Sequence, residues 1–154
     1  MNTLKKAALG GFILACLLLA GSRSTWSDTA DAKKAVIWTA SDIKWMDSPA
    51  FKGAKIAVLW GDPKTGGYGA LKSIPGGQTL QLHTHSYDQK VLILSGTIVL
   101  AVEGSAPKEL SHASFAFIPA GVRHTADCKS GADCVYFEEQ PGATDIKFVE
   151  KSPK

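Results

Sequence analysis

Two short stretches of sequence decide the fold: residues 77–89 read GQTLQLHTHSYDQ, and residues 119–124 read PAGVRH. In the first stretch, His83 and His85 are two positions apart, and alternate residues of a β-strand project to the same face of the sheet. Their imidazoles are therefore expected side by side. The second stretch ends at His124. Histidine is a common ligand of transition metals, so a fold that joins the two stretches would make a metal site.

The sequence around these stretches predicts β-structure. From residue 35 onward, short apolar or alternating runs rich in Val, Ile, Leu, Phe and Thr are separated by Gly and Pro clusters. Runs of this kind include residues 55–62, 90–102 and 134–139, and the breaks between them include Pro75-Gly76-Gly77 and Pro119-Ala120-Gly121. Short strands with turn residues at such intervals are typical of an all-β sandwich or barrel. Only residues 41–45 offer a short turn of helix, with Ser41 as its cap.

The first stretch resembles the first motif of the cupin superfamily, G-x5-H-x-H-x3,4-E-x6-G. Gly77, His83, His85 and Gly96 stand at the expected spacings, and Gln89 takes the place of the motif's glutamate. The chain is thus similar to small single-domain cupins of bacterial type.

The second stretch resembles the second cupin motif, G-x5-P-x-G-x2-H-x3-N. Pro119, Gly121 and His124 match it, whereas Ala113 replaces the first glycine and Cys128 replaces the final asparagine. Together the two motifs cover about a third of the chain.

The resemblance implies an all-β fold, the double-stranded β-helix or cupin jelly-roll barrel, with one divalent transition metal inside it. Carried over by position, the metal ligands are His83, His85, Gln89 and His124. Imidazole suits Fe, Mn, Ni, Zn or Cu, so the metal stays unidentified. In one alternative Gln89 does not ligate, which leaves three histidines with open positions for water or substrate. In another, the barrel binds no metal.

Glutamine at position 89 changes the charge of the proposed site. With a neutral amide in place of a carboxylate, the ion keeps its full double charge and becomes the stronger Lewis acid. From the sequence alone, replacing Gln89 by Glu is expected to tighten metal binding.

Two cysteines, Cys128 and Cys134, are expected to form a disulfide that contributes roughly 2–3 kcal/mol in the chain-entropy account. If the strands beside it paired as a hairpin, His124 would face Glu138, and Tyr136 would lie on the same side of the sheet. Glu138 and Tyr136 are therefore candidate catalytic residues, as proton acceptor and hydrogen-bond donor. The apolar alternation of the same strand favours the opposite parity, with Glu138 in water.

Two further expectations come from strand parity. Gln81 should share the face of His83 and His85, which makes it a candidate substrate-binding residue. Phe115 and Phe117 share one face of their strand and are expected in the core.

The N-terminus predicts export. Residues 1–22 carry two lysines and then an uncharged run from Ala7 to Ala20, which is typical of a signal peptide. This run is shorter than the roughly 20 residues that a membrane-spanning helix needs, so no permanent span is expected. Residues 23–34 are a flexible leader, and residues 35–154 form one cupin domain. A periplasmic or secreted protein is expected, and a lipoprotein anchored at Cys16 is the less favoured alternative.

Charge excludes one class of partner. The net charge of the whole chain is +3, and removing residues 1–22 lowers it by two to +1. Nucleic-acid binding depends on a concentrated positive surface, which this composition does not offer.

A small molecule is the expected partner, and a homodimer is possible through residues 35–37. The main functional expectation is an exported metal enzyme with dioxygenase-type chemistry on an enol, diketone or phenol. One alternative is a non-redox isomerase, lyase or cyclase that acts on a sugar acid or similar molecule. The other is a non-catalytic cupin that binds a small ligand or a metal, because a fold alone does not define a reaction.

Overall fold

β-Strands and turns make up the part of the chain that the computed structural model describes, residues 35–149. The predicted signal peptide (1–22) and leader (23–34) lie outside these residues. None of the described residues belongs to a helix that could span a membrane. The all-β prediction is confirmed.

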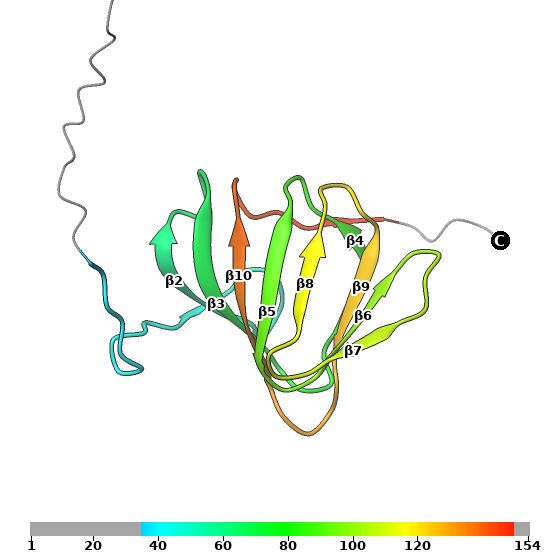
Figure 1. Cartoon of the computed structure of the whole chain (residues 1–154), viewed down its shortest axis with the longest axis horizontal. Coiled ribbons are helices and arrows are strands. Elements are labelled where there is room, and N and C mark those ends of the chain that lie inside the picture. The colour runs from blue at the N-terminus through cyan, green and yellow to red at the C-terminus, as the bar shows by residue number, and fades with distance from the viewer. Residues whose placement is uncertain (1–34, 150–154) are drawn as a thin grey trace, which may run out of the picture. The chain divides into compact units, whose positions relative to one another are not determined.

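Six strands form the first sheet, in which all neighbours are antiparallel. Figure 1 shows β2, β3, β10, β5 and β8 side by side. The order is β1 (Met46–Asp47), β2 (Lys55–Gly61), β3 (Tyr68–Ile74), β10 (Cys134–Gln140), β5 (Gln89–Ser95) and β8 (Phe115–Ile118).

Five strands form the second sheet, also antiparallel. Its order is β11 (Lys147–Phe148), β4 (Thr79–Thr84), β9 (His124–Cys128), β6 (Ile98–Val102) and β7 (Lys108–Leu110). The two cupin-like stretches of sequence are thus adjacent strands, because β4 carries the first and β9 begins at the end of the second.

The core lies between the two sheets. Ile74 and Ile93 of the first sheet pack in one buried cluster with Leu80 and Ile98 of the second. Burying each such side chain stabilises the fold by about 1.5–3 kcal/mol. The two sheets therefore form a sandwich around a common apolar centre.

Two turn positions explain the glycines of the motifs. Gly96 has a φ of +74°, a backbone conformation that residues with a side chain rarely adopt. A Cβ built there would lie 2.9 Å from Cys134 Sγ, so there is also no space for a side chain. Ala113, which replaces the first glycine of the second motif, also has a left-handed φ, +63°. Within the described residues it is the one non-glycine residue with a positive φ. An L-residue in this region is strained by about 1–2 kcal/mol.

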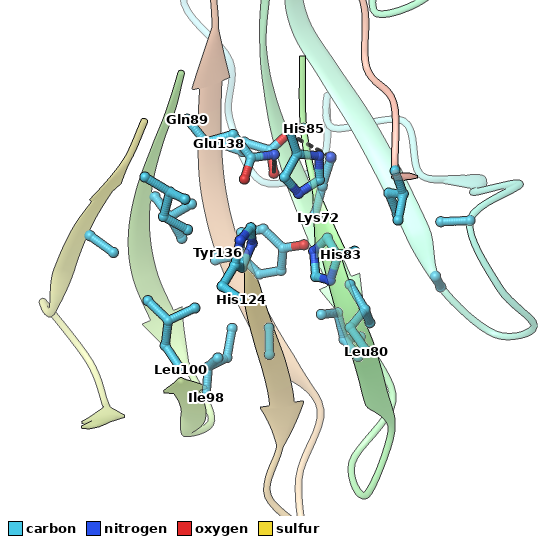
Figure 2. A pocket seen from close by; sticks show the side chains of 18 of the residues that line it. Lys72, Leu80, His83, His85, Gln89, Ile98, Leu100, His124, Tyr136 and Glu138 are labelled. Carbon is cyan, nitrogen blue, oxygen red and sulfur yellow. Dashed lines mark hydrogen bonds and ion pairs between the residues drawn. The ribbon is translucent and has the colours of Figure 1, made fainter. Parts of the chain in front are cut away.

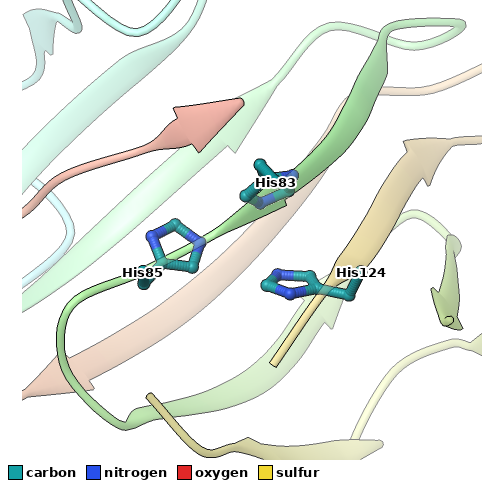
Figure 3. A group of neighbouring side chains, drawn as sticks. All are labelled: His83, His85 and His124. Atoms are coloured by element: carbon teal, nitrogen blue, oxygen red, sulfur yellow. The ribbon is translucent and has the colours of Figure 1, made fainter. Parts of the chain in front are cut away.

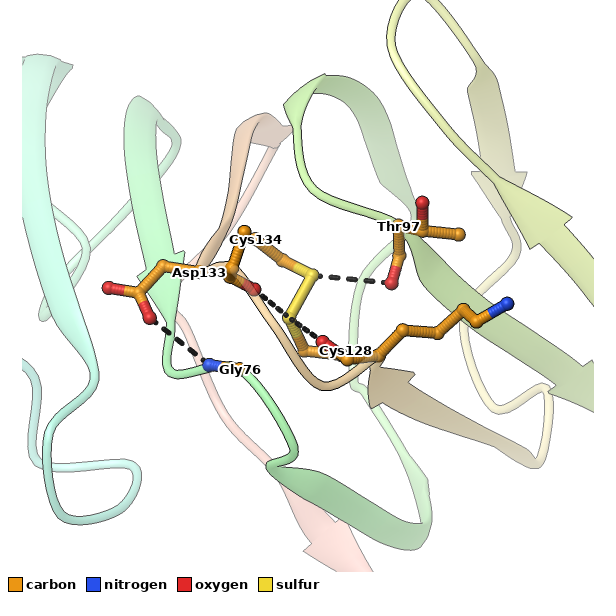
Figure 4. The surroundings of a disulfide bond; sticks show 7 residues. Gly76, Thr97, Cys128, Asp133 and Cys134 are labelled. Atoms are coloured by element: carbon orange, nitrogen blue, oxygen red, sulfur yellow. Dashed lines mark hydrogen bonds between the residues drawn. A yellow bond between two sulfur atoms is a disulfide. The ribbon is translucent and has the colours of Figure 1, made fainter.

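The structure joins Cys128 and Cys134 in a disulfide, with their Cα atoms 5.8 Å apart. Figure 4 shows the bond at the turn between β9 and β10, with Cys134 beside Thr97. The strands that it connects belong to different sheets. The disulfide therefore ties the two layers of the sandwich together.

Some local expectations are wrong. Residues 41–45 form no helix. Phe115 and Phe117 are 60% and 53% exposed, because they face outward from the edge strand β8 rather than into the core. Strand alternation predicts that such a pair shares a face, but not which face is buried.

Candidate metal centre

Three histidines meet between the sheets. His83 of β4 is paired directly with His124 of β9, and His85 follows two residues later. Ring nitrogens of the three side chains lie within 4.8 Å of one another, and all three residues are buried. Figure 3 shows the rings converging from the two segments. The convergence that the sequence predicted is present.

The orientation of each ring leaves one nitrogen free for a metal. Nδ1 lies beside a backbone carbonyl oxygen in all three histidines: that of Gln81 for His83 (2.6 Å), Asp145 for His85, and Val122 for His124 (2.9 Å). A carbonyl oxygen only accepts hydrogen bonds, so Nδ1 carries the hydrogen. Nε2 is then left without a hydrogen, as a metal ligand must be. The three residues therefore fit a transition metal chemically.

Burial also keeps the imidazoles neutral. It lowers the pKa of His83 to about 4, and it lowers the pKa values of His85 and His124 as well. Neutral imidazole is the form that binds metal, because a protonated ring has no lone pair to offer.

The three histidines line an interior cavity of about 80 Å³. Gln89, at the start of β5, also lines the cavity and is only 3% exposed. Figure 2 shows a polar end, with Gln89, Glu138 and His85 close together, and an apolar end, with Leu80, Ile98 and Leu100.

A buried ion pair lies beside Gln89. Glu138 Oε1 accepts hydrogen bonds from Lys72 Nζ and from the Tyr68 hydroxyl, both at 2.5 Å. Burial alone would raise the pKa of Glu138, but the charge of Lys72 and these two hydrogen bonds outweigh it and lower the pKa. The carboxylate is thus held in its charged, hydrogen-bond-accepting form.

The other oxygen of Glu138 faces Gln89. Gln89 Nε2 lies 3.5 Å from Glu138 Oε2 and 3.3 Å from Gln140 Oε1. Gln140 is in turn fixed by its own Nε2, which donates to the carbonyl oxygen of Gly142 at 3.1 Å. Gln89 is therefore part of an ordered polar network between β5 and β10.

Glu138 and Tyr136 both line the cavity, although not for the reason that the sequence suggested. The assumed pairing of their strand with the strand of His124 is wrong, since β10 pairs with β3 and β5, and β9 pairs with β4 and β6. The parity argument that put Glu138 in water is wrong too, because Glu138 is 3% exposed. Opposed sheets, rather than opposed strands, bring Glu138 near His85.

Gln81 is not in the cavity. Its side chain is exposed, because the pairing of β4 with β9 shifts register between Leu80 and His83. This irregularity puts Leu80 on the inner face with His83 and turns Gln81 outward. The expectation from regular alternation is wrong here, and Gln81 contributes only its backbone carbonyl to His83.

Sequence reasoning missed Lys72 and Tyr68. Both lie on β3 in the run YGALKSI, where Tyr68, Ala70, Lys72 and Ile74 alternate with the other face. The sequence did contain a signal: Lys72 is the one charged residue in an inward-facing series that is otherwise uncharged. A buried lysine needs a charged partner, so this pattern indicates a buried ion pair.

Comparison with sequence families gives one match, which spans the whole candidate site. The model of a family described as "Domain of unknown function (DUF4437)" matches residues 22–145. No curated protein matches the sequence.

Solved structures share the fold at low sequence identity. The polyketide cyclase RemF from Streptomyces resistomycificus is 17% identical with a TM-score of 0.63, covering 77% of this chain and 88% of its own. KdgF from Halomonas sp. is 18% identical with a TM-score of 0.56, covering 69% and 94%. An RmlC-like cupin protein from Ralstonia eutropha is 18% identical with a TM-score of 0.59, covering 74% and 79%.

These similarities confirm the cupin jelly-roll fold. Because one fold supports many reactions, the function must be argued from the site itself.

Proposed function

Because the chain belongs to the DUF4437 family, a domain of unknown function, we propose its function from the site: a metal-dependent enzyme acting on a small, largely apolar molecule that carries a metal-binding oxygen. The observation that carries this proposal is the arrangement of three buried imidazoles, each with Nδ1 on a carbonyl and Nε2 left free.

The metal is held by His83, His85 and His124, with Gln89 as the fourth protein ligand. Three histidines and one amide form a neutral donor set, so no ligand charge offsets that of the ion. A divalent ion there supplies Lewis-acid polarisation of a substrate oxygen, and its remaining positions are taken by water or substrate.

The cavity wall indicates the chemical class of the substrate. Its apolar end is lined by aliphatic side chains. Of the two lysines in the lining, Lys72 is buried with its charge neutralised by Glu138, and Lys55 is exposed at the outside of the cavity. Binding a sugar acid would need a free cation for the carboxylate and hydrogen bonds for several hydroxyls. An enol, diketone or phenol needs only the metal and an apolar wall, which favours these classes.

Non-redox chemistry is the first reaction class that we propose. A neutral donor set favours the divalent state of a metal, which suits an isomerase, lyase or cyclase. Tyr136, whose side chain lines the same cavity, is a candidate for hydrogen bonding to the substrate. Glu138 also lines the cavity, but its oxygens contact Lys72, Tyr68 and Gln89 and its pKa is lowered, so its carboxylate is a poor proton acceptor. Tyr136 stays a hydrogen-bond donor because burial raises its pKa.

Dioxygenase-type chemistry is the second candidate. It is supported by the same apolar cavity, which suits a phenol or diketone, and by the open positions that a three-histidine centre leaves. Both classes use the same residues to hold the ion.

Export to the periplasm or the outside of the cell completes the proposal. It is supported by the predicted signal peptide and by the Cys128–Cys134 disulfide, since disulfides persist in oxidising compartments.

The decisive experiment is metal analysis of the chain purified without chelators, followed by turnover of diketones and phenols with and without oxygen. We expect about one transition-metal ion per chain and anaerobic turnover. Oxygen uptake coupled to turnover would select the dioxygenase class. Bound metal with unchanged substrate would indicate a binding protein, and absence of bound metal would refute the proposal.

A further inference from the structure

Gln89 is surrounded on one side by atoms that only accept hydrogen bonds. Glu138 Oε2 is a carboxylate oxygen, and the Oε1 of Gln140 is an amide oxygen whose orientation is set because Gln140 Nε2 donates to Gly142. An amide has two N–H donors on one atom, and Gln89 Nε2 directs them toward these two acceptors. Its own Oε1 is left for the metal side of the cavity.

The charge of Glu138 fixes this arrangement. Oε1 of Glu138 is occupied by Lys72 and Tyr68, so the carboxylate offers Gln89 an acceptor and no donor. A flipped Gln89 amide would place its oxygen against Glu138 Oε2 and Gln140 Oε1, and its N–H groups toward the metal. Oxygen atoms without a hydrogen between them repel at these distances.

A carboxylate at position 89 would meet the same obstacle. Either of its oxygens would face Glu138 Oε2, and Lys72 is the single cation that contacts Glu138 among the described residues. Two carboxylates would then share one ammonium in a site where all three side chains are buried or nearly so.

We propose that Glu138 is a positioning residue that orients the Gln89 amide, with its Oε1 toward the metal, and thereby requires glutamine rather than glutamate at position 89. This rests on the proposed metal site. It reverses the expectation drawn from the sequence alone, in which Glu at position 89 tightens metal binding. The departure from the cupin motif at position 89 is thus matched by Glu138 on the neighbouring strand.

Exchanging the two side-chain types tests the proposal. In Gln89→Glu/Glu138→Gln, the new amide at position 138 donates to the carboxylate at position 89, so the hydrogen bond between these two positions is rebuilt with the same net charge, whereas the contact with Gln140 Oε1 is not. In Lys72→Met/Glu138→Gln, net charge is also unchanged, but residue 138 now offers both donor and acceptor, and the orientation of Gln89 is no longer fixed. The matched control is Lys90→Met/Glu139→Gln, an exposed ion pair (2.9 Å) on β5 and β10, the strands that carry Gln89 and Glu138.

Two properties are measured: zinc and manganese affinity by chelator competition, and the melting temperature of the metal-free protein. We expect Lys72→Met/Glu138→Gln to lose about 10–100-fold in metal affinity, the range for residues that orient ligands. Gln89→Glu alone should lower the metal-free melting temperature and should not tighten metal binding. Gln89→Glu/Glu138→Gln should recover part of the loss seen in Gln89→Glu alone, because the hydrogen bond between positions 89 and 138 is rebuilt, and the control should change neither property.

The outcomes separate the two proposals. If the wild-type chain binds metal and Gln89→Glu has the same effect whether or not Glu138→Gln is also present, the positioning role is refuted while the metal site stands. Unchanged affinity in Lys72→Met/Glu138→Gln refutes it as well. If the wild-type chain binds neither metal, the proposed function fails, and the orientation of Gln89 toward a metal fails with it.

Discussion

His83 on β4 lies directly opposite His124 on β9, and their ring centroids are 4.2 Å apart. Because each ring supplies one of three converging nitrogens, His83→Ala or His124→Ala should lower metal affinity by at least about 100-fold, at or beyond the upper end of the range for orienting residues. Elemental analysis and chelator competition measure this loss. The control is His112→Ala, an exposed histidine whose Nδ1 lies 2.9 Å from the carbonyl oxygen of Leu94. Full metal occupancy in either site variant would exclude the three-histidine centre.

Lys72 should matter for stability through Glu138. Lys72→Met removes the cation and leaves a buried carboxylate without a charged partner, which should lower the free energy of unfolding by about 3–5 kcal/mol. Lys72→Met/Glu138→Gln should recover most of this loss, because it removes both charges. Urea denaturation of the metal-free proteins provides the comparison, and equal stability of the two variants would contradict the buried ion pair.

Acid should destabilise the metal-free protein through His83. The folded-state pKa of about 4 lies below the ordinary value of 6.5, so the unfolded chain binds protons first as the pH falls. The stability contributed by the neutral ring is present above pH 6.5 and is lost between pH 6.5 and 4. Melting temperatures in chelator at about pH 7 and about pH 5, either side of the unfolded-state value, should show a fall for wild type and a smaller fall for His83→Asn. Equal falls would argue against burial of a neutral His83.

Ala113 gives a stabilising prediction. The left-handed φ of Ala113 costs an L-residue about 1–2 kcal/mol in the folded state, and Ala113→Gly removes this strain. Glycine also increases the conformational entropy of the unfolded chain, which offsets about 0.4–1 kcal/mol of the gain. The expected gain in unfolding free energy is about 0.5–1 kcal/mol. Ala120→Gly, at an exposed position without a positive φ, should instead destabilise. If both changes shifted stability in the same direction, the strain at Ala113 would be disproved.

Removal of the disulfide should affect stability more than the site. Cys128→Ser/Cys134→Ser should lower the free energy of unfolding by about 2–3 kcal/mol, because the bond restricts the unfolded chain. A reductant should destabilise wild type by a similar amount and leave the double variant unchanged. Metal affinity should stay within a few-fold of wild type, because the histidines lie away from the cross-linked ends of these strands. A loss of metal affinity as large as that of His83→Ala would contradict this separation.

The fold and the three histidines were predictable because they depend on spacing. His83, His85 and His124 stand at fixed intervals from turn glycines, and a turn is encoded within a few residues. Gln81 was placed on the wrong face because the prediction assumed regular strand alternation, and the sequence does not reveal the register shift between β4 and β9. Glu138 could not be placed from one strand, since its inward direction depends on pairing with β3 and β5. Its partner Lys72 is 66 positions away in sequence, so the ion pair is visible only in three dimensions.

The cross-link between Cys128 and Cys134 has a consequence for how a ligand enters. It fastens the last residue of β9 to the first residue of β10, whereas His124 begins β9 and Gln140 ends β10. Motions that separate the two sheets are therefore opposed at one rim by the disulfide as well as by connecting loops, whereas the other rim is crossed only by the loops at residues 85–88, 119–123 and 141–146. A ligand is expected to enter at the rim without the disulfide. The entrance would then lie at the end of the barrel where β9 begins with His124.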